Sequence, residues 1–246
     1  MFFTLAGSFK AFSPLHGVTL LVCAAAIYAV VRIGLAARRT GRERRVTRMI
    51  AWLGLAFWLV HQGHYAFIKG DWIDGLPLHI CDLAGLLGPL ALLGQNRLLR
   101  TTVYFWALGL SIWGLLTPVL TRGPADIVFW FFWINHGSVM LYAIYDCAVR
   151  GYRPTAADWG MSCLVTLGYV AVIVPINIGM GWNYGYMGDV ELDAATPLAL
   201  LPAWPWSILG IEVLGAFMLA NAWLPWEVVG WRARRRARAQ EQAEGA

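Results

Sequence analysis

Charged residues are scarce in this chain of 246 residues. They make up 13% of it, against roughly 25% in an average soluble domain. Hydrophobic residues make up 59%, and the mean hydropathy is +0.58. The shortage of charge excludes a soluble globular enzyme and a disordered chain. It indicates a multi-pass membrane protein, because crossing the core of a bilayer takes about 20 consecutive apolar residues.

Cysteine pairs and common metal-binding motifs are also missing. The four cysteines, Cys23, Cys81, Cys147 and Cys163, form no CxxC pair, which excludes a disulfide-rich secreted module and a zinc knuckle. The sequence contains no HExxH motif, no internal repeat and no apparent cleavable signal peptide. The net charge of +5 comes from short arginine runs beside apolar segments. Such runs are typical of membrane proteins, so we expect no nucleic-acid partner.

The apolar residues gather into seven stretches long enough to be transmembrane helices. We place them at residues 15–36, 48–68, 76–94, 101–121, 126–149, 157–178 and 203–225. Gly85, Gly88 and Pro89 in the third stretch predict a kink there. The sequence therefore predicts an all-α fold, a seven-transmembrane-helix bundle. We expect a single domain over residues 1–231, followed by a polar, basic tail over residues 232–246.

The basic residues of the predicted loops indicate the orientation. Fifteen arginines lie in the loops after the first, third and fifth stretches and in the C-terminal tail, whereas Lys10, Lys69 and Arg122 are the basic residues of the alternate set. Lys and Arg concentrate on the cytoplasmic side of membrane proteins. We therefore predict an N-terminus outside and a C-terminus in the cytoplasm, in a cell membrane that we expect to be a bacterial inner membrane.

Polar residues inside apolar segments are costly, so their positions are informative. In the predicted orientation they gather toward the outer side, and the inner half is nearly free of ionisable groups. The outer set comprises His16, His61, His64, His79, Cys81, Asp82, Asn135, His136, Asn177, Asn183 and Tyr184. This asymmetry predicts one polar cavity that opens toward the outside or toward the outer leaflet. For any single member, a structural hydrogen bond between helices is an equally ordinary role.

Cys81 is the thiol that the pattern favours as a nucleophile. It follows Pro77, which is a good first-turn residue, and a thiol in the first turn of a helix is favoured as a thiolate. His79 lies two positions before Cys81 and so points away from it on a helix, whereas His79 and Asp82 share a face. We therefore predict that His136, from another helix, is the base for Cys81. Asn135 or Asn183 would then stabilise an oxyanion.

Several short motifs resemble those of the bacterial YwaF-type integral membrane family. They are residues 76–82 (LPLHICD, near its PLHLC signature), 135–137 (NHG), 175–177 (PIN), 183–187 (NYGYM) and 204–206 (WPW) with Glu212. That family is related to the animal transmembrane protein 164, described as an intramembrane acyltransferase that moves a fatty acyl chain onto a lysophospholipid through a Cys/His pair. The resemblance implies that Cys81 matches the nucleophile and His136 its paired histidine.

Our preferred interpretation is an intramembrane acyltransferase or acyl hydrolase that acts on a phospholipid or lysophospholipid through a thioester on Cys81, with no cofactor and no metal. His79, Asp82, His61, His64, Asn135, Asn177, Asn183 and Tyr184 are the expected supporting or substrate-binding residues. Three alternatives stay open. One is a small-solute or proton-coupled transporter or binding protein, with His61, His64 and Glu212 titrating. The second is a zinc-dependent intramembrane lipid hydrolase, and the third is a scaffold without chemistry. In the zinc-dependent alternative, the metal ligands would come from His61, His64, His79, Asp82 or His136.

Overall fold

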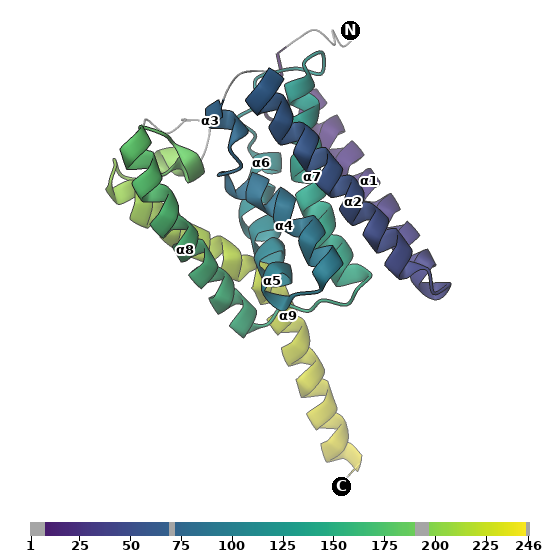
Figure 1. Cartoon of the computed structure of the whole chain (residues 1–246). Coiled ribbons are helices and arrows are strands. Elements are labelled where there is room, and N and C mark those ends of the chain that lie inside the picture. The colour runs from purple at the N-terminus through teal and green to yellow at the C-terminus, as the bar shows by residue number, and fades with distance from the viewer. Residues whose placement is uncertain (1–7, 69–71, 190–196, 245–246) are drawn as a thin grey trace.

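The computed structural model describes residues 8–68, 72–189 and 197–244, and every regular element in these ranges is a helix (Figure 1). The elements are α1 (Pro14–Arg39), α2 (Glu43–Gly63), η1 (His64–Ile68), α3 (Trp72–Gly75), α4 (Ile80–Gly94), α5 (Arg97–Phe105), η2 (Trp106–Ser111), α6 (Ile112–Leu116), α7 (Ile127–Ala148), α8 (Ala156–Met180), η3 (Tyr184–Tyr186), η4 (Pro197–Leu200) and α9 (Trp206–Glu244). Both η1 and η2 are π-helical turns, whereas η3 and η4 are 3₁₀ turns.

All seven predicted stretches fall on helical segments. Among the described residues, five segments are long and apolar enough to cross a membrane, namely α1, α5 to α6, α7, α8 and α9. Helix α4 is apolar but has only 15 residues, and α2 with η1 forms the remaining segment. The all-helical class is thus confirmed. The count of seven crossings and the orientation of the termini stay predictions.

The helices begin where the sequence supplies caps. Ser13 accepts a hydrogen bond from the backbone N–H of His16, and Pro14 occupies the first turn of α1. Asp126 caps α7 by accepting from the N–H of Val128. Thr155 and Asp158 form a reciprocal capping box at the start of α8. Each cap satisfies N–H groups that have no partner within the first turn.

Four helices, α1, α2, α4 and α7, pack closely on one side of the bundle. Helix α2 packs on α4, and α4 and α1 pack on α7, as Figure 1 shows. The Tyr142 side chain of α7 fits against Gly54 of α2 and Gly88 of α4, where an added Cβ would overlap its ring or hydroxyl. Helices α8 and α9 pack on each other on the other side, and α9 also packs on η2. The turn η2 contacts α4, α7 and α9, so it lies at the centre of the bundle.

Several predicted helix ends are displaced by four or five residues, and one of them bears on the site. The third segment begins at Ile80 rather than at residue 76, because His79 has an extended backbone (φ −71°, ψ 143°) and is the N-cap. Pro77 therefore lies before the helix and not in its first turn, although Cys81 does lie in that turn. Helix α9 also covers the polar, basic stretch at residues 232–244 and extends beyond the other helices (Figure 1). Ala, Arg, Gln and Glu, which fill that part of the chain, are strong helix formers.

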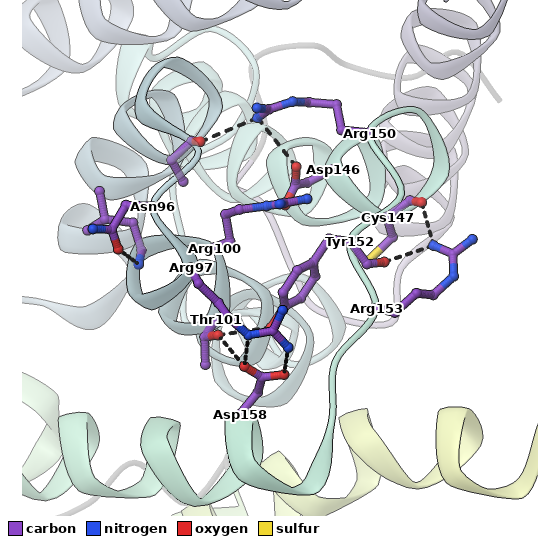
Figure 2. A network of polar contacts seen from close by, with 12 residues as sticks. Asn96, Arg97, Arg100, Thr101, Asp146, Cys147, Arg150, Tyr152, Arg153 and Asp158 are labelled. Carbon is purple, nitrogen blue, oxygen red and sulfur yellow. Dashed lines mark hydrogen bonds and ion pairs between the residues drawn. The ribbon is translucent and has the colours of Figure 1, made fainter. Parts of the chain in front are cut away.

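The prediction that the inner half is nearly free of ionisable groups is also wrong. At the end of the bundle that holds residues 95–96 and 149–155, here called the arginine end, two buried aspartates bind arginines (Figure 2). Arg97 binds Asp158 through two nitrogens, at 3.0 and 2.6 Å. Arg100 and Arg150 both contact Asp146, at 2.7 and 3.4 Å. A buried carboxylate persists when it is paired in this way.

The loop between α7 and α8 completes this network. Arg153 donates to the backbone oxygens of Cys147 and Tyr152, and its guanidinium lies over the Trp226 ring of α9 (Figure 2 shows the hydrogen bonds). The Tyr152 hydroxyl lies 3.0 Å from the hydroxyl of Thr101. Burial raises the pKa of Tyr152, so its hydroxyl keeps its proton. The arginine end is therefore a connected polar clamp across α5, α7, α8 and α9.

Candidate functional site

A cavity of about 490 Å³ lies toward the other end of the bundle. This volume is within the range of small-molecule sites, about 300–1,000 Å³. Its walls come mainly from α4, from the segment η2 to α6, from α7 and from α9, with single residues from α2, η1 and α8 and with residues 185–187 at its edge. The predicted site residues that line it are His61, His79, Cys81, Asp82, Asn135 and His136. The structure thus brings both predicted catalytic residues to one cavity.

The start of α4 is held in place from two neighbouring helices. The Tyr169 hydroxyl of α8 donates to the backbone oxygen of Leu78, at 2.8 Å. The indole N–H of Trp58 on α2 donates to the backbone oxygen of Asp82, also at 2.8 Å. Cys81 lies between these two anchors, in the first turn of α4. The position of its thiol in the cavity wall is therefore fixed by the backbone on both sides.

The hydrogen bonding of His136 shows which ring nitrogen is available. Its Nδ1 lies 2.9 Å from the backbone oxygen of Phe132. A carbonyl oxygen only accepts, so Nδ1 carries the proton and Nε2 of the neutral ring is an acceptor. The ring lies against the Phe132 side chain, with centroids 4.3 Å apart. On its other side Nε2 approaches Gly114 of α6 so closely that an added Cβ would overlap it. The imidazole is therefore held in one tautomer and one position.

Asp82 and Asn135 form a buried pair beside His136. The Asn135 amide donates to Oδ1 of Asp82, at 3.0 Å, and the two residues are 4% and 9% exposed respectively. Gly85 makes room for the pair, because an added Cβ would lie 2.8 Å from Oδ1 of Asn135. His79 is the N-cap of α4 and Asp82 lies in its first turn, and the pairing of their side chains stays a prediction.

The cavity also contains Ser111 and Thr166, which were not predicted as site residues, and Glu212, which was predicted to titrate in the transporter alternative. Ser111 is buried, and its side chain approaches the Cys81 thiol from the π-helical turn η2. Thr166 of α8 and Glu212 of α9 line the cavity as well. Single π-helical turns are frequent at functional sites, but the sequence of η2 carries no signal for one. Glu212 did carry a signal, since it is an acidic residue within an apolar stretch.

The paired histidines at the end of α2 both pack against the Phe131 ring, with centroids 5.5 Å (His61) and 5.0 Å (His64) away, but only His61 lines the cavity. His61 is buried and has its Nδ1 2.7 Å from the side-chain oxygen of Gln62. His64 begins the π-helical turn η1. Within the part of the chain that the structure describes, no three His, Cys, Asp or Glu side chains form a group that could hold a metal ion. The zinc ligands expected from this region are therefore not brought together.

Three predicted supporting residues lie outside the cavity wall and shape the turn after α8. The side-chain amide of Asn177 donates to the backbone oxygen of Tyr184, at 2.8 Å. Its side-chain oxygen accepts from the backbone N–H of Tyr184, at 3.0 Å. The side-chain oxygen of Asn183 accepts from the N–H of Gly188. The Tyr184 ring packs edge-on against His79, with centroids 4.9 Å apart. These residues hold residues 184–187 over the cavity. Glu191 and Asp193, further along this loop, lie outside the described residues.

His16 has a structural role. Its Nε2 lies 2.8 Å from the backbone oxygen of Leu115, and its Nδ1 accepts from the N–H of Phe12. Both ring nitrogens of this buried residue are thus occupied, and it does not line the cavity. Its bond joins the start of α1 to the end of α6, next to Gly114 and the catalytic candidates.

The fold and the cavity define a class: an all-helical, multi-pass membrane protein with a polar cavity among its helices, in contact with membrane lipids. The model of the TMEM164 family matches residues 11–222 of the chain, so the chain belongs to the TMEM164 family. No curated protein and no solved structure matches it. The predicted relation to transmembrane protein 164 is confirmed. The narrower assignment to the bacterial YwaF-type family stays a prediction.

Proposed function

We propose that this protein is an intramembrane acyltransferase or acyl hydrolase, with Cys81 as the nucleophile and His136 as the general base. The observation that carries the proposal is that both side chains line one cavity, and that His136 presents Nε2, its accepting nitrogen, on the side of Gly114. A thiol and a positioned imidazole acceptor are the minimal groups for an activated thiolate. Asp82 lines the same cavity and binds Asn135, the residue next to His136, and a carboxylate near an imidazole stabilises its protonated form.

The reaction would proceed in two balanced halves. His136 takes the proton of Cys81, and the thiolate sulfur bonds to the carbonyl carbon of a phospholipid ester. The ester C–O bond breaks, and the leaving oxygen takes the proton from His136, which leaves a thioester on Cys81. A lysophospholipid hydroxyl or a water then gives its proton to His136 as its oxygen attacks the thioester carbon, and the thiolate leaves.

Stabilisation of the oxyanion would come from the start of α4 and from Asn135. The first N–H groups of a helix have no partner within the helix and point out of its N-terminal end. Cys81 lies in this first turn. The Asn135 amide has two N–H bonds, and its contact with Asp82 uses one of them. Donors placed where negative charge develops are commonly the largest contribution to acyl-transfer catalysis.

The charges around the cavity favour a lipid ester as the acyl donor. Among the described residues that line it, Asp82 and Glu212 are acidic, and none is Lys or Arg. A donor with several phosphates, such as an acylated nucleotide carrier, needs basic partners that this wall does not offer.

We extend the proposal to seven membrane crossings, with the arginine end in the cytoplasm of a bacterial cell.

The test is intact-protein mass spectrometry on protein purified with its native lipids, before and after hydroxylamine. We expect an acyl-sized adduct on the wild type that hydroxylamine removes and that Cys81→Ala lacks. Cys163→Ala is the matched control, because this half-buried thiol does not line the cavity. A persistent adduct in Cys81→Ala, or undiminished acyl transfer by that variant, would contradict the proposal. Loss of activity in chelator would favour a zinc hydrolase, and solute flux that survives Cys81→Ala would favour a transporter.

A further inference from the structure

The cavity wall includes residues of α6 and α9, and the part of the cavity between these two helices is here called the groove. Helix α9 contributes Ile211, Leu214, Gly215 and Met218 to its wall. Spacings of three and four residues place these positions on one face of a helix. Helix α9 packs on η2, whereas α6 packs on η2 and α7. Both helices line the groove, and α6 does so through Trp113 and Gly114.

The groove reaches the protein surface beside α6. Trp113 and Val119 line it and are 36% and 43% exposed. Trp113 belongs to a segment that is long and apolar enough to cross a membrane, as do Leu214 and Gly215 of α9. In a membrane the mouth of the groove therefore faces lipid chains as well as the end of the bundle. An apolar groove in this setting fits a hydrocarbon chain better than a hydrated solute.

Gly215 lies on the groove wall with free space in front of it. A Cβ added there would meet Leu110 Cδ2 at 3.9 Å, an ordinary contact. Gly114 and Gly109 differ, because a Cβ at either position would overlap a neighbouring side chain. Close packing between helices therefore does not require a glycine at position 215. The effect of this glycine is to leave the groove open.

We propose that the groove between α6 and α9 binds the acyl chain of the lipid substrate and that Gly215 determines how long a chain it accepts. This inference rests on the proposed function for the reaction at Cys81. The chain lies along the face of α9 that carries Leu214, Gly215 and Met218, with its carbonyl carbon at the Cys81 thiol. A larger side chain at position 215 shortens the groove and excludes the longer chains first.

The kinetic test compares Gly215→Phe with Gly168→Phe. Gly168 is exposed on α8 and has no atom within 4 Å of an added Cβ, so it controls for a new aromatic ring in the membrane. We expect Gly215→Phe to lower the ratio of kcat/KM for a long-chain over a short-chain phospholipid about tenfold, the size of effect that methylenes have in apolar pockets. Gly215→Ala should lie between this variant and the wild type. An unchanged ratio in Gly215→Phe would overturn the proposal.

A second measurement separates the groove from the chemistry. A phospholipid with a photoreactive group on its acyl chain is crosslinked to Cys81→Ala, with and without Gly215→Phe, and the adducts are mapped by mass spectrometry. We expect adducts on Trp113, Leu214 or Met218 that Gly215→Phe removes. Adducts confined to the exposed residues Val213 and Phe217 would refute acyl-chain binding in the groove, even if the wild type transfers acyl chains. Adducts in the groove without any acyl transfer by the wild type would support acyl-chain binding there and refute the proposed function.

Discussion

Gly114 of α6 and His136 of α7 are matched in shape, because Nε2 of the histidine occupies the space that a side chain at position 114 would fill. The accepting nitrogen of the proposed base is thus positioned by the absence of a Cβ on a neighbouring helix. Phe132 restrains the same ring from the other side, through its backbone oxygen and its aromatic face. The position of the base is therefore a property of the α6–α7 contact as much as of His136.

Gly114→Ala should therefore reduce acyl transfer although it changes no reacting group. The added methyl group displaces the imidazole, and a misplacement of about 1 Å costs roughly 10²-fold in rate. Gly137→Ala is the matched control, because its Cβ would meet only Cys23 Sγ at 3.7 Å. The measurement is kcat on a phospholipid substrate, with thermal unfolding of both variants in detergent. Equal activity of the two variants would show that Gly114 does not position the base.

Asn135 and Asp82 allow the structural and electrostatic roles of one pair to be separated. Asn135→Asp places two carboxylates about 3 Å apart, which is unfavourable, and we expect unfolding at a lower temperature. Exchange of the two residues, Asp82→Asn with Asn135→Asp, restores one donor and one acceptor and should recover most of the stability. Activity should stay low in the exchanged variant, because the charge beside His136 has moved. Full recovery of activity would assign the pair a purely structural role.

The turn after α8 should depend on the amide of Asn177. Asn177→Asp removes the N–H that binds Tyr184 and sets a carboxylate oxygen against the carbonyl of that residue. A buried group left without its partner costs about 1–3 kcal/mol. We expect faster limited proteolysis near Tyr186 and a higher KM. Asn221→Asp makes the same chemical change in an exposed amide that binds Phe217, and it should have little effect. Similar proteolysis of both variants would contradict a special role for Asn177.

The positions of the helices could be predicted from the sequence because apolar stretches of membrane length are a strong signal. The predicted helices at residues 126–149 and 157–178 differ from α7 and α8 by at most two residues at each end. The start of α4 was missed, since an apolar run does not show where Leu78 and His79 change to an extended backbone. The Cys81 and His136 candidates came from their depth in the predicted spans, and the structure brings both to one cavity.

The residues that shape the cavity could not be predicted in the same way. Ser111 enters the cavity wall through a π-helical turn, and the apolar pattern of residues 106–111 does not distinguish that turn from an α-helix. Gly114 and Gly215 act by leaving space, which is visible only once a neighbouring helix is placed. Asp146 and Asp158 were missed because the arginines around them had been considered only as signals of orientation. Their role depends on contacts between α5, α7 and α8, far apart in the sequence.

The clamp at the arginine end should stabilise the bundle without taking part in the chemistry. Asp158 accepts from Arg97, from Thr101 and from the N–H and hydroxyl of Thr155, and its side chain is 7% exposed. Asp158→Asn removes the charge and replaces one accepting oxygen by a donor that faces other donors. We expect a loss of about 2–3 kcal/mol in the free energy of unfolding, moderated because Arg97 is largely exposed.

The matched control for the clamp is Glu227→Gln, which removes the charge from an exposed ion pair with Arg234. Exposed pairs contribute about 0–1 kcal/mol, so this variant should unfold at nearly the wild-type temperature. Both variants should keep the wild-type kcat per folded molecule, because neither residue lines the cavity. If Asp158→Asn unfolds at the temperature of Glu227→Gln, the aspartate does not hold the helices together. If its kcat falls while the fold is retained, the arginine end is coupled to the site through α8, whose Tyr169 anchors the start of α4.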